Sequence, residues 1–193
     1  MPKPDDTKDK GADRDSLVEK LLETRNIVLS QEVGDESTHR VIQQLLLLDA
    51  MDSAKEIRIY INSPGGSADG GFAMFDTIRF IKAPVHTIAA GLVASAASII
   101  LLGAKPELRF GFPHCRILLH QPSTHLQGSA ADIEITAQEI LKLREKANQL
   151  IAAETGQTVD KVAADTNRDY WMGPEEAKRY GLIHKVLRSR DDV

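Results

Sequence analysis

Three side chains that could together perform serine hydrolysis lie far apart in this sequence of 193 residues. Ser95 stands in the small, apolar stretch GLVASAAS, His120 follows the apolar run RILL, and Asp169 lies in the polar stretch DTNRDYWM. Serine attack on a carbonyl requires a base, a group that orients the base, and donors for the oxygen that becomes negatively charged. Ser95 is the candidate for the attacking hydroxyl, His120 for the base and Asp169 for the group that orients the base. The backbone N–H groups of Gly65 and Gly66 could approach a substrate carbonyl.

Each of these residues also has an ordinary structural interpretation. A serine among alanines usually packs, and a histidine at a strand end is usually only hydrogen-bonded. An aspartate in a polar turn is usually a cap, and SPGG is usually a turn. Whether they act together depends on the elements that position them.

Alternating strand-like and helix-like stretches predict an α/β layered fold with parallel strands. Period-two and β-branched patterns predict strands over 26–29, 56–63, 85–91, 108–113 and 115–122. Helical periodicity predicts helices over 17–25, 36–52, 67–82, 94–104 and 132–155. In the second of these helices Ser37 or Thr38 is the expected N-cap, and the expected apolar face is Val41, Ile42, Leu45, Leu46 and Leu48.

Ser95 falls at a junction between a strand and a helix, where a sharp turn exposes a hydroxyl and the helix N-terminus favours negative charge. Ser98 lies one helical turn later and is interpreted as a packing residue. The helix over 132–155 is about 35 Å long, so it either crosses the whole core or reaches out to another subunit. Its expected apolar face ends before Gly156, a suitable C′ residue, and comprises Ile133, Ala137, Ile140, Leu143, Ala147, Leu150 and Ile151.

Composition limits the possible functions. The net charge is −4 and no phosphate-binding loop is present, so nucleic-acid binding is not expected and any ATP hydrolysis must come from a partner chain. The one cysteine, Cys115, fits a reducing compartment and is expected to be buried and inert. The apolar stretch 84–104 is interrupted by polar residues, so no membrane span is expected. The histidines show no metal-ligand spacing, so no metal site is expected.

The chain is expected to be organised as a disordered polar tail over 1–15 and a single domain over 16–193.

Five motifs occur in an order that resembles ClpP, the family of proteolytic subunits of the Clp protease. They are INSPGG (61–66), G-x-x-A-S (91–95), LLHQP (118–122), QG…DIEI…EILK (127–142), and DTNRD followed by M-x-x-E-E-A-x-x-Y-G-L-I (165–183). The separations of 25 residues from Ser95 to His120 and of 49 from His120 to Asp169 agree with that family, and the resemblance covers about 21–187.

This resemblance implies a role for each matching residue. Ser95 would be the nucleophile, His120 the general base and acid, and Asp169 the group that orients the imidazole. The backbone N–H groups of Gly66 and Ala96 would form the oxyanion hole. Asp165 is the rival acid, and the alignment with the family favours Asp169. Arg168 would belong to contacts that link ring assembly to the triad.

The resemblance also implies an architecture and partners. The fold would be a crotonase-like, repeated β-β-α spiral with a protruding long "handle" helix. Two stacked seven-membered rings would enclose a chamber, and a Clp-type AAA+ ATPase would use ATP to feed in unfolded polypeptides. The chain itself would bind no cofactor and act in the cytoplasm.

Departures from the family pattern leave alternatives open. Leu92-Val93 and Ala96-Ala97 replace the usual neighbours of the serine, residues 1–15 are polar where the family lines its axial pore, and Arg58 stands where an aromatic residue often helps form the ATPase-docking pocket. One alternative is a weakly active or structural ring subunit that supports a second ClpP-like subunit. Another is an acyl-CoA hydratase-like enzyme, which uses similar glycine turns but needs no Ser-His pair.

Overall fold

The computed structural model describes residues 17, 18, 20–123 and 127–192, and it confirms the α/β prediction. The described strands form one sheet in the order β1-β2-β3-β4-β7, with β5 paired to β3 and β6 paired to β5. All pairs are parallel except β5–β6, which is antiparallel. The strands are β1 (Asn26–Leu29), β2 (Ile57–Ser63), β3 (Val85–Ala94), β4 (Arg109–Gly111), β5 (Arg116–Leu119), β6 (Tyr170–Met172) and β7 (Lys185–Val186).

Strand β3 changes partner along its length. Its residues 87–89 pair with β4, and its residues 92–94 pair with β5. Gly91 lies between these two segments with a φ of 121°, a conformation that favours glycine. This change of partner directs the end of β3, just before Ser95, toward β5, just before His120.

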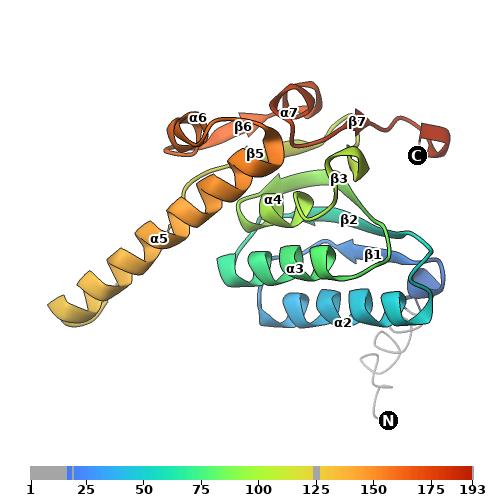
Figure 1. The fold of residues 1–193 in the computed structure, drawn as a ribbon, viewed down its shortest axis with the longest axis horizontal. Coiled ribbons are helices and arrows are strands. Elements are labelled where there is room, and N and C mark those ends of the chain that lie inside the picture. Colours follow the sequence, from blue (N-terminus) through green and yellow to red (C-terminus); the bar gives the residue numbers. More distant parts are fainter. Residues whose placement is uncertain (1–16, 19, 124–126, 193) are drawn as a thin grey trace, which may run out of the picture.

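Three helices pack against one side of the sheet (Figure 1): α2 (Asp35–Met51), α3 (Ala68–Phe80) and α4 (Ala96–Leu101). The predicted alternation in β2 is confirmed, because Ile57, Ile59 and Ile61 are fully buried in the core. Residues 17, 18 and 20–23 are helical, within the helix predicted over 17–25. Farther along the chain lie α5 (Ala130–Thr155), α6 (Val159–Asp165) and α7 (Pro174–Tyr180), with short 3₁₀ turns at Pro106–Leu108 and Arg190–Asp192.

Two details of α2 differ from the prediction. The N-cap is Gly34 rather than Ser37 or Thr38, and the Ser37 hydroxyl instead accepts a hydrogen bond from the Gly34 N–H at 2.9 Å. The helix therefore starts three or four residues earlier than a cap at Ser37 or Thr38 would allow. Leu46 was expected on the buried face but is 44% exposed, because the buried stripe follows Val41, Leu45 and Leu48.

Helix α5 leaves the body of the molecule, as its length suggested (Figure 1). Its fully buried residues are Asn148, Ile151 and Ala152, all in its C-terminal third. Farther out, Ile135 and Leu141 are each 61% exposed. On the expected apolar face, Ile133 is also exposed, and the residues that pack against the core of the same chain are Leu143, Ala147, Leu150 and Ile151. That face therefore meets the core only in the C-terminal half of the helix, which ends at Gly156 in the left-handed conformation, as predicted.

The C-terminal elements α6, β6, α7 and β7 had no counterpart in the sequence prediction, although local signals mark two of them. The Thr158 hydroxyl caps α6 by accepting from the Lys161 N–H, and Pro174 and Gly181 bound α7. Among the described residues, no helix has the length and apolar character needed to cross a bilayer. The tail expected over 1–15 lies outside the described residues.

Candidate active site

Ser95 occupies a strained turn between β3 and α4. Its φ of 56° and ψ of −125° are unusual for a residue with a Cβ, a conformation that costs about 1–3 kcal/mol. Neighbouring hydrogen bonds hold the turn, since the Ser95 N–H donates to the Leu118 carbonyl at 3.0 Å and the Ser98 N–H donates to the Ser95 carbonyl at 2.9 Å. The half-buried serine is thus presented at the N-terminus of α4, as predicted.

The turn after β2 packs directly against Ser95. Gly65 has a φ of 90°, and a Cβ placed on it would lie 2.5 Å from the Ala94 carbonyl oxygen and 2.7 Å from the Ser95 Cβ. No residue with a side chain fits this contact, so the glycine is required for the turn to reach the serine.

Two backbone N–H groups near Ser95 are oriented or placed so that they can receive an anion. Gly66 bridges Val33, and the bonds of that bridge use the Gly65 carbonyl and the Ser67 N–H, so the Gly66 N–H is directed away from Val33. Ala96 is the first residue of α4, where N–H groups have no acceptor within the helix.

His120 lies at the end of β5 and lines the same hollow as Ser95. The segment that follows is tied to the α6–β6 loop, because the Gln121 N–H donates to the Thr166 carbonyl at 2.7 Å and the Gln121 amide donates to the Asn167 carbonyl at 2.8 Å. These two bonds bring the loop that carries Asp169 beside His120.

Asp169 stands immediately before β6 and is exposed. In the antiparallel β5–β6 pair, Leu119 faces Tyr170, so the same register continued by one residue places His120 opposite Asp169. Asp169 is not among the residues that line the hollow. Within the described chain, no hydrogen bond joins the side chains of Ser95, His120 and Asp169, so the structure brings the first two to one hollow and the third to the neighbouring strand position.

The rival acid, Asp165, is engaged by other groups. Its carboxylate accepts a hydrogen bond from the Tyr180 hydroxyl at 2.9 Å and lies 2.6 Å from the Lys161 Nζ. Burial, together with the bond to this carboxylate, raises the pKa of Tyr180, and the same carboxylate raises the pKa of Lys161. Asp165 therefore links α6 to α7, and neither of its partners lines the hollow.

The hollow beside Ser95 has a volume of about 820 Å³ and a wall of both polar and apolar residues. Its apolar part includes Phe72 of α3, Ile99 of α4 and the α5 residues Ile140, Leu143 and Ile151. Helical periodicity predicted a helix over 67–82, which contains Phe72, and placed Ile151 on the apolar face of the helix over 132–155, without separating core from site. Their periodicity carried no further signal, because a pocket wall and a core face share the same spacing.

The structure also bears on the expectations for Ser98, Cys115 and Arg168. Ser98 is buried and its hydroxyl donates to the Ser95 carbonyl at 2.6 Å, so its packing role is confirmed. Cys115 is buried, and burial raises the pKa of its thiol to about 11, so the thiol stays protonated near neutral pH. Arg168 is exposed beside Asp169, and its proposed part in assembly stays a prediction.

A second hollow, also of about 820 Å³, lies over the other face of the sheet. Its apolar lining includes Tyr60, Ile88, Phe112 and Leu187. Arg58 also lines it, with its guanidinium paired to the Glu56 carboxylate. Arg58 therefore lies beside apolar side chains of this hollow, and the part of the hollow in ATPase docking stays a prediction.

Comparison with known proteins gives one consistent result. A family model described as Clp protease matches residues 9–190. The chain is 52% identical over 189 residues to a protein of Treponema denticola named "ATP-dependent Clp protease proteolytic subunit 2", covering 98% of this chain and 94% of that one. It is 47% identical over 193 residues to a protein of the same name in Treponema pallidum, covering 98% and 97%.

A solved structure agrees with these relatives. The structure titled "ClpP1 N165D mutant from Listeria monocytogenes" superposes with a TM-score of 0.84 at 40% sequence identity, covering 91% of this chain and 98% of that chain. The expected α/β ClpP fold is therefore confirmed.

Proposed function

The chain belongs to the Clp protease family, as a serine protease and proteolytic subunit of the ATP-dependent Clp protease, and on that premise we propose that Ser95, His120 and Asp169 are its catalytic triad. The observation that carries this proposal is the common hollow of Ser95 and His120, with the serine held in a strained turn at a helix N-terminus. The continued β5–β6 register supports Asp169 as the third member.

In the proposed mechanism, the Ser95 Oγ attacks the peptide carbonyl carbon while His120 takes its proton. Asp169 holds the imidazole in the required tautomer and stabilises the imidazolium that forms. The N–H groups of Gly66 and Ala96 donate to the developing oxyanion. His120 then gives the proton to the leaving amine, and water releases the acyl group from Ser95 by the same steps.

A fluorophosphonate tests the assignment of the nucleophile. We expect one covalent adduct per chain by intact mass, located on Ser95 by peptide mapping, and loss of peptide hydrolysis in proportion to labelling. Full hydrolysis by a chain fully labelled at Ser95 would contradict the proposal.

We further propose that the unit of action is a single peptidase domain over 16–193 in two stacked seven-membered rings. The exposed apolar side chains of α5, Ile135 and Leu141, support burial against other copies, since large exposed apolar groups mark interaction sites. Phe80 at the end of α3 is 81% exposed and likewise supports contact with other copies of the chain. Arg168 is proposed to link this assembly to the triad.

The rings are expected to hydrolyse short peptides unaided and folded proteins only with a Clp-type AAA+ ATPase and ATP. Light scattering combined with peptide and folded-substrate assays measures both properties. A stable monomer that hydrolyses peptides at the rate of the assembled protein would contradict this expectation.

The partner ATPase is proposed to use the ATP, while this chain binds no cofactor of its own and cleaves unfolded polypeptides to short peptides in the cytoplasm. A reducing compartment suits its one buried cysteine, Cys115. The second candidate is a weakly active or structural subunit in rings with a related subunit. The charge of Arg58 in the second hollow favours that candidate, and the name "proteolytic subunit 2" of the two Treponema proteins supports a second, related subunit.

Arg58→Tyr is expected to increase degradation of a folded protein by rings of this chain alone with an ATPase from the same source. We propose that the second hollow receives an apolar loop of the ATPase, which gains about 25 cal/mol for each Å² of apolar surface buried. A guanidinium in the hollow must stay solvated or be desolvated at a cost. Because equivalent sites around a ring act together, a small gain per site becomes a gain of about threefold or more in the degradation rate.

Hydrolysis of a short peptide serves as the internal control for Arg58→Tyr, since it needs no docking and should not change. The docking proposal is wrong if the unmodified rings already degrade the folded protein at full rate. It is also wrong if the substitution leaves the ATP-dependent rate unchanged, in which case the Arg58 stem lies along the pocket with its head in water.

A further inference from the structure

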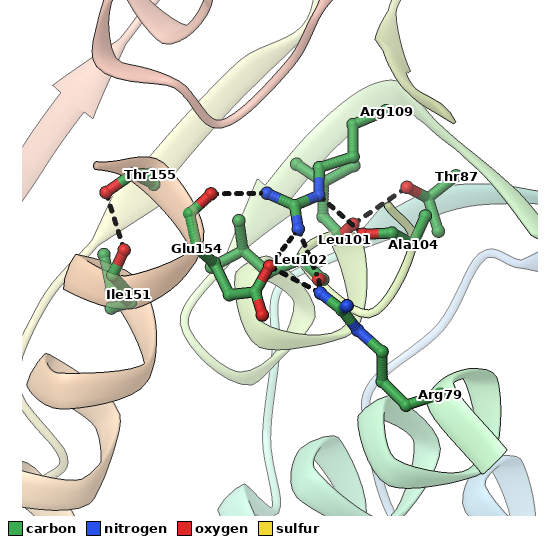
Figure 2. Close-up of polar contacts among 9 residues, drawn as sticks. All are labelled: Arg79, Thr87, Leu101, Leu102, Ala104, Arg109, Ile151, Glu154 and Thr155. Carbon is green, nitrogen blue, oxygen red and sulfur yellow. Dashed lines mark hydrogen bonds and ion pairs between the residues drawn. The ribbon is translucent and has the colours of Figure 1, made fainter. Parts of the chain in front are cut away.

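The short helix α4 is anchored at the end opposite Ser95 by one buried arginine (Figure 2). Arg109 in β4 has no exposed surface. Its guanidinium donates to the Ala104 carbonyl at 2.8 Å and to the Leu102 carbonyl at 2.9 Å, just beyond the last turn of α4. A positive charge at this end of a helix is favourable because the free carbonyls there carry partial negative charge.

The same arginine also holds the base of α5. Its Nη1 donates to the Glu154 carbonyl at 2.8 Å, and its Nη2 pairs with the Glu154 carboxylate. Arg79 of α3 binds that carboxylate from the other side, with its Nη2 at 2.5 Å (Figure 2). Glu154 is thus shared by two cations from two different elements.

Because Arg109 is buried, its positive charge needs a nearby negative partner. Desolvation lowers the pKa of Arg109, and the bond to Glu154 opposes that effect. Removing one partner of a buried ion pair leaves an uncompensated charge in a medium of low polarity. The three side chains therefore fix α3, α4 and the end of α5 to one another through a contact that tolerates little displacement.

Two of the helices held by these side chains, α4 and α5, line the hollow beside Ser95. Ile99 of α4 and Ile151 of α5 both line it, and Ile151 lies three residues before Glu154 on the same helix. A change in the distance between α4 and the end of α5 would therefore move lining residues of the hollow relative to each other.

We propose that Arg109, Glu154 and Arg79 form a clamp that sets the width of the substrate pocket, and through it the size of the side chain accepted beside the scissile bond. All three are positioning residues that act through Ile99 and Ile151. The proposal deepens the proposed function, because it takes the hollow beside Ser95 to be where substrate binds.

The test compares two fluorogenic peptides that differ only in leucine or alanine before the cleaved bond, with kcat and KM measured on assembled rings. A defined apolar pocket separates side chains that differ by one methylene by roughly tenfold or more. Glu154→Gln loosens the clamp, so the leucine-to-alanine ratio of kcat/KM is expected to fall by about three- to tenfold. A purely structural role would lower the midpoint of thermal unfolding and leave this ratio unchanged.

Glu107→Gln is the matched control, since Glu107 is exposed and acts on Arg109 only through its charge. It should keep the wild-type ratio. An unchanged ratio in Glu154→Gln, or an equal fall in Glu107→Gln, would overturn the proposal. If Glu154→Gln does not assemble, Arg79→Gln decides alone, because it removes only the more exposed cation: a lower ratio supports the clamp and an unchanged ratio overturns it. Hydrolysis of either peptide by the wild-type chain tests the proposed function separately.

Discussion

Replacing Ser95 by alanine is expected to lower kcat for hydrolysis of a short peptide by roughly four to six orders of magnitude, the loss that follows removal of a triad nucleophile. Alanine keeps the Cβ, so the turn at φ 56° stays in a backbone region that is strained for serine and alanine alike. The rings should still form, because the Ser95 hydroxyl makes no hydrogen bond within the described structure. Initial rates with a fluorogenic peptide, together with light scattering, measure both properties.

Ser98→Ala is the matched control for this change. Ser98 lies three residues later, is buried, and donates its hydroxyl to the Ser95 carbonyl at 2.6 Å. Its removal should destabilise the fold by about 1 kcal/mol, the net value of one such bond, and change kcat far less than Ser95→Ala does. Peptide turnover retained in assembled Ser95→Ala, or an equal loss in Ser98→Ala, would mean that Ser95 is not the nucleophile.

Sequence patterns predicted the positions of Ser95 and His120, because these positions depend on local strands and turns. The alternation of Ile57, Ile59 and Ile61 marks β2, and the change from a β-branched stretch to a small-residue run marks the turn at Ser95. Parallel strands end at the same edge of a sheet, so the ends of β3 and β5 meet, and Ser95 and His120 line one hollow.

The position of Asp169 depends on a longer-range contact. It rests on β6, a strand of three residues whose pairing with β5 sets the register opposite His120. No pattern within Tyr170–Met172 specifies an antiparallel partner some fifty residues earlier. The motif resemblance supplied that assignment, and the bonds from Gln121 to the α6–β6 loop give its physical basis.

Two further features lie beyond what periodicity can specify. The apolar residues of α5 repeat at helical spacing along its whole length, yet Ile133 of that repeat is 38% exposed, because a repeat does not say whether its partner is the same chain or another. Arg109 is a charged residue at the start of a strand and would ordinarily be expected at the surface. It is buried because Glu154, 45 residues away in the sequence, folds back against it.

Asp169→Asn is expected to lower kcat for the peptide by roughly three to four orders of magnitude, while Asp165→Asn lowers it by less than about tenfold. An asparagine opposite His120 cannot stabilise the imidazolium and favours the wrong tautomer of the ring. At Asp165 the same change removes the ion pair with Lys161 and weakens the bond from the Tyr180 hydroxyl, which join α6 to α7. Side-by-side kinetics and thermal unfolding of the two variants are the measurement.

The two substitutions are therefore expected to affect different properties, thermal stability at Asp165 and catalytic activity at Asp169. Asp165→Asn should lower the midpoint of thermal unfolding more than Asp169→Asn does, because the exposed Asp169 makes no ion pair in the described part of the chain, whereas Asp165 has two partners. The activity should follow the opposite order. A larger loss of kcat in folded, assembled Asp165→Asn would show that the orienting carboxylate is Asp165. The loop that follows α6 would then have to turn so that Asp165 exchanges Lys161 and Tyr180 for His120.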